Sequence, residues 1–110
     1  MFDFDGFDSA VADHTMTKLD DQIAQNREEL DRRPPGNIGR AQALYSLADS
    51  VRRRFNETNA SADIDEAIAL HRQALDLRPT GDRDRQQSLH RLARCLHKRY
   101  RNITGKKIFR

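Results

Sequence analysis

The chain has 110 residues, of which 36% are hydrophobic and 34% charged, and its formal net charge is +3. This length allows one domain with a thin core, and no apolar run reaches the roughly 18 residues that a membrane-spanning helix needs. Cys95 is the single cysteine, which excludes an intramolecular disulfide. Acidic residues rather than a signal peptide follow Met1, so we expect a cytoplasmic location without membrane attachment.

Charge is distributed unevenly along the chain. Residues 1–31 contain nine acidic and two basic side chains, whereas residues 32–110 contain 18 basic and eight acidic ones. The basic part is compatible with a partner that carries phosphates or carboxylates. Arginines that only solvate the outer faces of helices are the other interpretation.

Residues 1–15 are expected to form an acidic, aromatic N-terminal arm. Phe2, Phe4 and Phe7 are interleaved with aspartates in this stretch. Such a segment is too short and too acidic to bury itself. We expect either a disordered lead-in or an arm that docks its phenylalanines on an apolar groove.

The first predicted helix begins at Ser9 or Thr17 and ends at Arg33. Apolar residues recur in it at three- and four-residue spacing, and Pro-Pro-Gly at residues 34–36 stops it. The apolar positions are Leu19, Ile23 and Leu30.

Three more helices follow by the same reasoning. The second spans about residues 38–55, the third begins at an N-cap Ser61 and ends before Pro79, and the fourth spans about residues 84–101. Short connections between them make consecutive helices antiparallel. The expected fold class is all-α, with two antiparallel helix hairpins.

The chain also contains an internal repeat. Residues 68–81 (IALHRQALDLRPTG) rewrite residues 23–36 (IAQNREELDRRPPG), 45 positions upstream, and the correspondence continues to Tyr100 opposite Phe55. A fixed period of this size is typical of stacked helical units. We expect one domain over residues 16–104, with units at about 16–60 and 61–104, and a basic C-terminal tail at 105–110.

The second copy resembles a known family. The segment SADIDEAIALHRQAL at residues 61–75, followed by LRPTG at 77–81, resembles tetratricopeptide repeats, in particular a long-period subtype similar to kinesin light chain. The resemblance covers residues 16–104. It implies that the two hairpins stack as a fragment of a right-handed superhelix.

Two features depart from the family pattern. The period of 45 residues is longer than the usual 34. Glu29 and Arg32 also stand where the second copy has Ala74 and Leu77. The first unit is therefore expected to pack less tightly than the second.

The resemblance implies a peptide-binding inner face, lined by the first helix of each unit. An Asn or His there can hydrogen-bond an extended peptide, and arginines can bind carboxylates. The other interpretation is that His71 packs against a neighbouring helix and that Arg72 pairs with Asp76. The expected groove residues are Gln22, Asn26, Arg27, Glu29, His71 and Arg72.

Two units are fewer than such arrays generally need, which is about three with a polar terminal helix. The fourth helix should therefore have an uncovered apolar side. A second copy is the simplest cover, in a dimer or in a head-to-tail stack that joins the acidic N-terminal segment to the basic fourth helix. A fragment of a longer array would have the same sequence signature. The expected self-association residues are Leu89, Leu92, Leu96, Tyr100 and Phe109.

The alternative function is nucleic-acid or phosphate binding by the basic fourth helix. Only Tyr100 and Phe109 lie nearby as aromatic platforms, which weakens the case for single-strand binding. The basic patch would consist of Arg91, Arg94, Lys98 and Arg101.

No catalytic or metal-binding pattern is expected. His90 and His97 share a helical face from which Cys95 is rotated away, which disfavours a zinc site. Neither an oxyanion loop nor a glycine-rich phosphate loop accompanies them. We expect a non-catalytic adaptor or scaffold that binds a protein or peptide and uses no cofactor.

Overall fold

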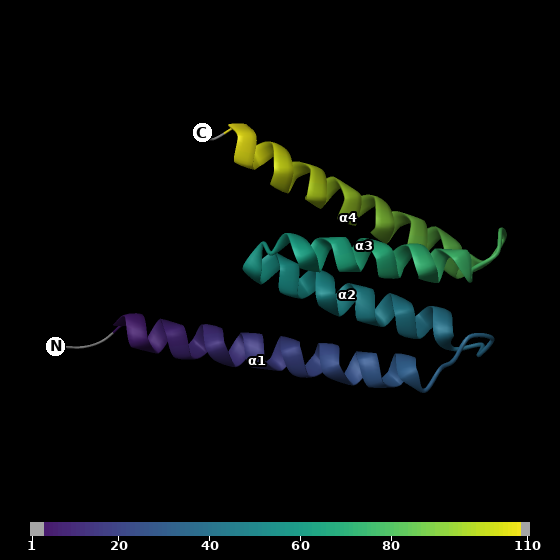
Figure 1. The fold of residues 1–110 in the computed structure, drawn as a ribbon, viewed down its shortest axis with the longest axis horizontal. Helices are drawn as coiled ribbons and strands as arrows, with labels where there is room; N and C mark the ends of the chain where they lie inside the picture. The colour runs from purple at the N-terminus through teal and green to yellow at the C-terminus, as the bar shows by residue number, and fades with distance from the viewer. Residues whose placement is uncertain (1–3, 109–110) are drawn as a thin grey trace.

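The structure is a computed structural model that describes the backbone of residues 4–108 and the side chains of residues 16–104. Figure 1 shows the helices in chain order, each antiparallel to the one before it. The described residues contain no strand, which confirms the predicted all-α class. The helices are α1 (Phe4–Asp31), α2 (Arg40–Thr58), α3 (Ser61–Asp76) and α4 (Arg83–Ile108).

α1 begins upstream of both predicted starts, because its backbone is helical from Phe4. Most of the expected N-terminal arm is thus continuous with this helix. The predicted docking of Phe2, Phe4 and Phe7 concerns side chains outside the described residues. The helix ends at Asp31, ahead of the prolines, because a proline disfavours helical dihedral angles in the residue that precedes it.

A two-residue connection, Asn59 and Ala60, joins α2 to α3. Asn59 has a left-handed φ of 58°, which asparagine tolerates better than most residues. The predicted N-cap at Ser61 is wrong, because Ala60 occupies that position and makes no side-chain cap. Thr58 stabilises the turn instead: its Oγ1 accepts a hydrogen bond from the Ala60 N–H at 3.1 Å.

α4 continues to Ile108, well past the expected end near Arg101. The stretch predicted as a separate tail, 105–110, is helical through Ile108 and is therefore an extension of α4. No proline or turn motif interrupts the helix after Arg83, and a single Gly105 is tolerated within it.

The connection between α1 and α2 and the connection between α3 and α4 have the same geometry. Gly36 and Gly81 both have a φ of 93°, which residues with a side chain rarely adopt. Matching arginines close the two turns: Arg40 Nη1 donates to Arg33 O at 2.7 Å, and Arg85 Nη1 donates to Arg78 O at 2.6 Å. The 45-residue repeat of the sequence is therefore also a repeat of structure.

The core lies mainly between α2 and α3, with α1 packed on α2 and α4 packed on α3 (Figure 1). Leu30, Leu92 and Leu96 pack at its edge. The largest fully buried apolar side chains are Leu44, Leu47, Ile64, Val51 and Cys95. This row of four helices places α4 at one end, with one side that no other described helix covers.

The two departures in the first unit have different consequences. Leu77 is 49% exposed, so this position makes few buried contacts even in the second unit. Arg32 at the same position therefore does not loosen the packing of the first unit, contrary to expectation. Ala74 is fully buried, but its counterpart Glu29 keeps its side chain 40% exposed and pairs with Arg33 Nε at 2.7 Å. The ion pair with Arg33 lowers the pKa of Glu29.

Candidate functional site

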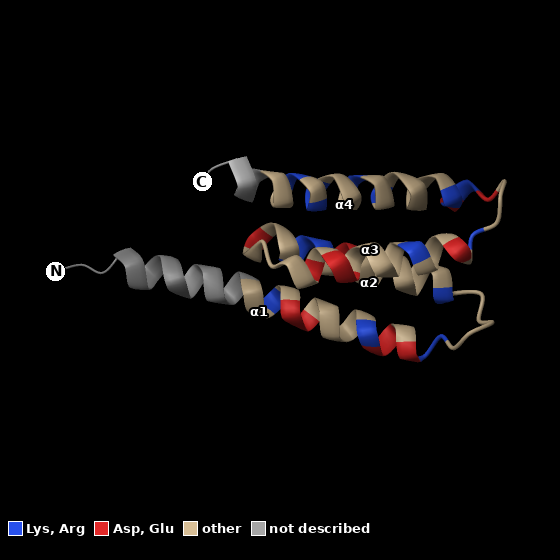
Figure 2. Cartoon of the chain, turned by 45° about the horizontal axis from the view of Figure 1, so that its top comes forward, with Lys and Arg blue, Asp and Glu red and all other residues tan. Residues whose placement is uncertain are grey.

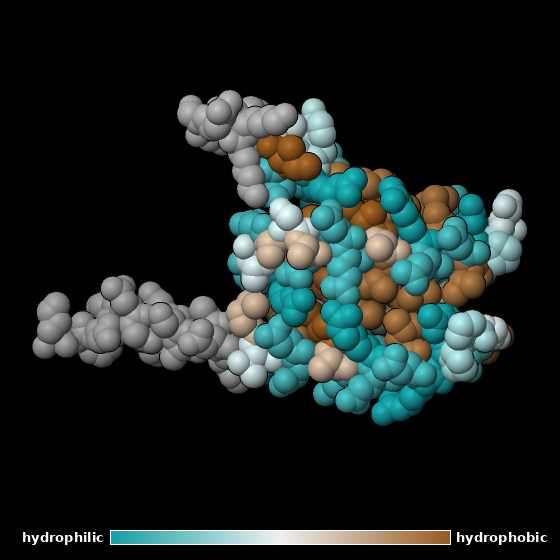
Figure 3. All heavy atoms as spheres, in the orientation of Figure 1, coloured by the Kyte–Doolittle hydropathy of each residue, from teal (hydrophilic) through white to brown (hydrophobic). Residues whose placement is uncertain are grey.

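α4 presents an apolar face that no other described element covers. Leu89 is 45% exposed, Tyr100 65% and Ile103 50%, and the exposed Ala93 belongs to the same face. In Figure 3, apolar residues drawn in brown reach the surface over α4 among polar residues in teal. Exposed apolar area of this kind marks interaction sites in proteins.

The predicted self-association residues divide into two groups. Leu89 and Tyr100 are exposed and available to a partner. Leu92 and Leu96 are instead partly buried against the core, so they support the fold. Phe109 lies outside the described residues.

The internal repeat explains why this face is exposed. The counterparts of Leu89, Ala93 and Tyr100 in α2 are buried: Leu44 is 1% exposed, Ala48 0% and Phe55 5%. α3 packs on α2, whereas no described element packs on the corresponding side of α4. The uncovered face of α4 is therefore the repeat equivalent of a face that a helix covers in the first unit.

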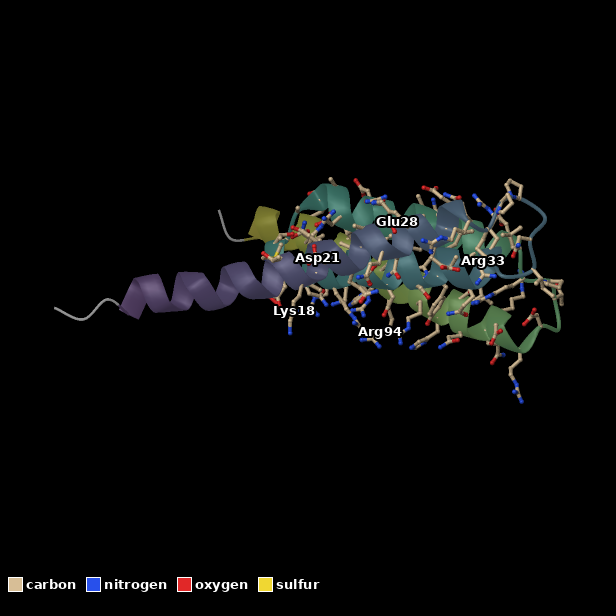
Figure 4. The ribbon with its side chains drawn as sticks, turned by 90° about the horizontal axis from the view of Figure 1, so that it is seen from below. Lys18, Asp21, Glu28, Arg33 and Arg94 are labelled. Atoms are coloured by element: carbon tan, nitrogen blue, oxygen red, sulfur yellow. The ribbon has the colours of Figure 1, made fainter. Side chains whose placement is uncertain are left out.

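A hollow of about 350 Å³ lies on the same part of α4. Within the described part of the chain, neither Arg94 nor Arg101 pairs with an acidic side chain. Arg94 extends from the edge of the molecule in Figure 4. The lining residues are His90, Ala93, Arg94, His97, Lys98 and Arg101.

Two of the four predicted basic-patch residues are engaged within the fold. Arg91 donates from Nε to the Tyr45 hydroxyl at 2.9 Å, and its Nη1 lies 3.8 Å from Asp49 Oδ1. Lys98 donates to Asn56 Oδ1 at 3.2 Å. Arg91 therefore ties α4 to α2, which corrects its assignment to a free basic surface.

The predicted self-association and basic-patch residues did not include His90, Ala93 or His97, which the structure places beside them on α4. The repeat itself carried the missing signal. His90 and Ala93 stand 45 positions after Tyr45 and Ala48, both of which are buried in α2.

Three of the predicted groove residues lie at the junction of α1 and α2. Asn26 donates from Nδ2 to Ser50 Oγ at 3.0 Å and to Ser46 O at 3.3 Å, and Gln22 donates to Asn26 Oδ1 at 3.2 Å. Asn26 lines two adjacent hollows of about 280 and 260 Å³, which Glu29 and Gln22 respectively also line. The Asn26 amide thus already stabilises the packing of α1 on α2.

His71 is in the core rather than on a groove, which corrects its expected role. Its side chain is fully buried, and its ring packs edge-on against Tyr45 with the centroids 5.2 Å apart. Among the described residues, neither of its buried ring nitrogens has a hydrogen-bond partner. Burial lowers the pKa of His71 to about 4, so the ring is neutral and out of reach of a surface peptide.

Arg27 and Arg72 occupy the same repeat position but have different surroundings. Arg27 Nη1 lies 2.8 Å from Glu66 Oε2, which joins α1 to α3. Arg72 is exposed and forms no ion pair within the described residues, so the predicted pair with Asp76 is absent. The six predicted groove residues therefore do not line one continuous groove.

The described residues offer no group of three side chains that would hold a metal ion. Cys95 is fully buried, and burial raises the pKa of its thiol. Among the described residues no helix combines the length and the apolar character that crossing a membrane requires.

Comparison of the chain with protein-family models, with characterised proteins and with solved structures gave no match. The resemblance to tetratricopeptide repeats therefore rests on the residues quoted above for it.

Proposed function

We propose that this protein is a non-catalytic protein-interaction module of the tetratricopeptide type, and that it binds a helix of a partner polypeptide on the uncovered face of α4. The sequence left two possible partners, a peptide segment or a second copy of the chain, and the proposal assigns the binding to one surface with defined residues. Leu89, Ala93 and Tyr100 form its apolar centre.

One observation carries the proposal. Leu44 and Leu89 occupy the same repeat position, yet they are 1% and 45% exposed. In the first unit this position is buried in α2, on which α3 packs, so we infer that the position is suited to helix packing in the second unit as well. Burying Leu89 and Tyr100 would remove apolar surface from water, at about 25 cal/mol per Å² before the costs of association.

A catalytic role has less support from the chemistry of the described side chains. Cys95 is fully buried and its pKa is raised, so its thiol is neither reachable nor readily ionised. His71 is buried as well. The interaction face, by contrast, is made of side chains that reach the surface.

The test is a selection of displayed helical peptides against the 110-residue chain, followed by NMR mapping of the selected binders. We expect the largest amide shifts in α4 between residues 89 and 103. Ala93→Phe should abolish binding because it places a bulky side chain at a close-contact position. The matched control is Ala69→Phe on the exposed side of α3, which should bind normally. Binders that map elsewhere, or that tolerate Ala93→Phe, would contradict the proposal.

The second candidate function, binding of nucleic acid or another phosphate-bearing ligand, is favoured by Arg94 and Arg101. Both line the hollow on α4, and neither is paired with an acid within the described residues. Phosphate contacts make such binding strongly salt-dependent. The test is a mobility-shift assay with single-stranded RNA and DNA at 50 mM salt. A shift that Arg94→Gln together with Arg101→Gln removes supports this function, and the absence of any shift rules it out.

A further inference from the structure

The contacts that α3 makes with the first unit indicate which side chains a helix bound on α4 needs. Arg54 of α2 binds two carboxylates: Asp20 of its own unit at 3.0 Å and Asp63 of α3 at 2.9 Å. Arg27 of α1 binds Glu66 of α3 at 2.8 Å. α3 thus supplies two carboxylates, three residues apart, to two arginines of the unit that it covers.

The second unit has the same two arginines without the second set of acids. Arg99, the counterpart of Arg54, binds Asp65 of its own unit at 3.3 Å, as Arg54 binds Asp20. No second carboxylate of the described residues binds Arg99 in the way that Asp63 binds Arg54. Arg72, the counterpart of Arg27, has no ion pair within the described residues. Two acid-binding positions are therefore vacant beside the uncovered face.

We propose, on the basis of the interaction function above, that the partner is an acidic amphipathic helix of a different protein, seated on α4 as α3 is seated on α2. Its recognition elements follow from α3. An Asp and a Glu three residues apart, as in Asp63 and Glu66, bind Arg99 and Arg72. Small residues at the positions of Ala67 and Ala74, which are both fully buried, let the two helices approach closely.

The surrounding charge agrees with an acidic partner. Arg94 stands at the repeat position of Asp49, so the second unit has a cation where the first has an anion. Arg101 is also unpaired within the described residues. In Figure 2, the positions of Lys and Arg, drawn in blue, recur along the ribbon of α4. A neutral or basic helix would leave this charge uncompensated, whereas an acidic one is attracted to it.

A second copy of the chain is a poor occupant in the head-to-tail arrangement. α1 would have to take the place of α3, but its matching face is polar. Lys18 stands where α3 has Asp63, so it would meet Arg99 with like charge, which is unfavourable. The small and apolar positions are also replaced by longer polar side chains, which do not fit a close helix contact: Gln22 replaces Ala67, Gln25 replaces Leu70 and Glu29 replaces Ala74.

A symmetric pairing of two α4 helices is disfavoured for a related reason. Arg94 and Arg101 lie on this part of α4 and line its hollow. A two-fold contact would bring these cations of both copies together, and like charges that face each other across an interface disfavour the complex. The charges therefore favour a heterotypic complex over both forms of self-association.

The experiment measures binding of three stapled helical peptides to the full 110-residue chain by fluorescence anisotropy. The first peptide has the α3 sequence of residues 60–77, the second is the same peptide with Asp63→Asn and Glu66→Gln, and the third has the α1 sequence of residues 15–32. We expect the first peptide to bind at least about tenfold more tightly than the second, since charge-assisted contacts are lost. The third should bind weakest.

Variants of the chain test the assigned contacts. Arg72→Gln together with Arg99→Gln should remove the difference between the first two peptides, because their carboxylates then have no partners. Arg32→Gln, at an exposed arginine that directly follows α1, is the matched control and should preserve the difference. Sedimentation equilibrium of the chain alone at micromolar concentration should give a mass of 12.7 kDa.

Three results would overturn the inference. These are equal binding of the first two peptides, preferential binding of the α1 peptide, and a dimer or stack that Ala93→Phe disrupts. The last two would still leave α4 as an interaction surface, so they contradict the acidic partner without contradicting the proposed function. Selected helices that bind elsewhere on the chain would contradict the proposed function itself.

Discussion

Nη2 of Arg54 lies 2.9 Å from Oδ1 of Asp63 across the interface of α2 and α3, and the Asp63 side chain is only 10% exposed. Arg54 also donates to Asp63 from Nε at 3.2 Å, so the guanidinium binds the carboxylate with two nitrogens. This pair joins the first unit to the second, and the shielding of both charges makes it stronger than a pair at the surface.

We expect Asp63→Ala to lower the free energy of unfolding by about 2 kcal/mol, because a charged hydrogen-bond acceptor is removed from a shielded arginine. Asp65→Ala is the matched control. Asp65 is 58% exposed in its pair with Arg99, so its loss should cost at most about 0.5 kcal/mol. Urea denaturation followed by circular dichroism measures both. Equal losses would show that the Arg54 pair is no stronger than an exposed one.

Arg78 and Arg33 are repeat counterparts that should differ in their effect on stability. Arg78 is 4% exposed, donates to Ser88 Oγ at 2.6 Å and to Gln42 Oε1 at 3.0 Å, and lies over the Tyr45 ring. Arg78→Ala should cost about 2–3 kcal/mol, since it leaves the buried Ser88 hydroxyl without this partner.

Arg33→Ala serves as the control for Arg78→Ala. The Arg33 side chain is 43% exposed. It lies just past the end of α1 and pairs with Glu29 of that helix. Its removal should cost no more than about 0.5 kcal/mol. The same denaturation measurement applies, and a larger loss for Arg33→Ala than for Arg78→Ala would contradict the assigned role of Arg78 between the units.

His71 should make the fold sensitive to mild acid. Burial, opposed by the nearby Asp49 and assisted by Arg91, lowers its pKa from 6.5 to about 4. The unfolded chain therefore takes up a proton first as the pH falls. The stability that the neutral ring contributes is present above pH 6.5 and is lost between pH 6.5 and 4, by about 2 kcal/mol at pH 4.5.

His71→Leu isolates this effect, because carboxylates titrate alike in both proteins. The variant should lose about 2 kcal/mol less than the natural chain between pH 7 and pH 4.5. At pH 7 it should not be strongly destabilised, since it also removes two unpaired buried nitrogens. Parallel acid dependence of the two unfolding free energies would refute the low pKa of His71.

Cys95 should react with a thiol reagent only when the fold opens. Its side chain is fully buried, and burial raises the pKa of the thiol, so both access and ionisation are reduced. At pH 8 we expect the native chain to react at least about a hundredfold more slowly than the chain in urea, in line with an opening equilibrium of a few kcal/mol.

The control for Cys95 is an exposed thiol in the same chain. Ala69→Cys, combined with Cys95→Ala, places the cysteine on the exposed side of α3. This variant should react with Ellman's reagent at nearly the same rate in native buffer and in urea. Rapid reaction of native Cys95 would show that α4 detaches readily from the core.

Local features of the sequence were sufficient to predict the four helices and their connections. The helical spacing of Leu19, Ile23 and Leu30 can be read from one short stretch of the chain. The turns at Gly36 and Gly81 likewise depend only on nearby residues. The helix ends were less accurate: α1 begins at Phe4 and α4 continues to Ile108. No strong stop signal marks those ends, so propagation of the helix decided them.

The candidate site was predicted only in part, because the sequence could not say which repeat positions are covered. Leu89 and Tyr100 were assigned to the exposed side of α4, and they are exposed. His71 was assigned to a surface on the strength of its match with Asn26, yet it is fully buried. A helical pattern shows that residues share a face, but it does not show which neighbour lies on that face.

By itself, the sequence determined the helices, the turns and the 45-residue repeat, because hydrogen bonding within a helix and the dihedral preferences of proline and glycine act over a few residues. Only the tertiary structure decided that Arg78 is buried while Arg33 is exposed, and that Leu44 is covered while Leu89 is open. Equivalent residues differ in this way because burial depends on segments distant in the chain, and α2 has a following helix packed on it where α4 has none among the described residues.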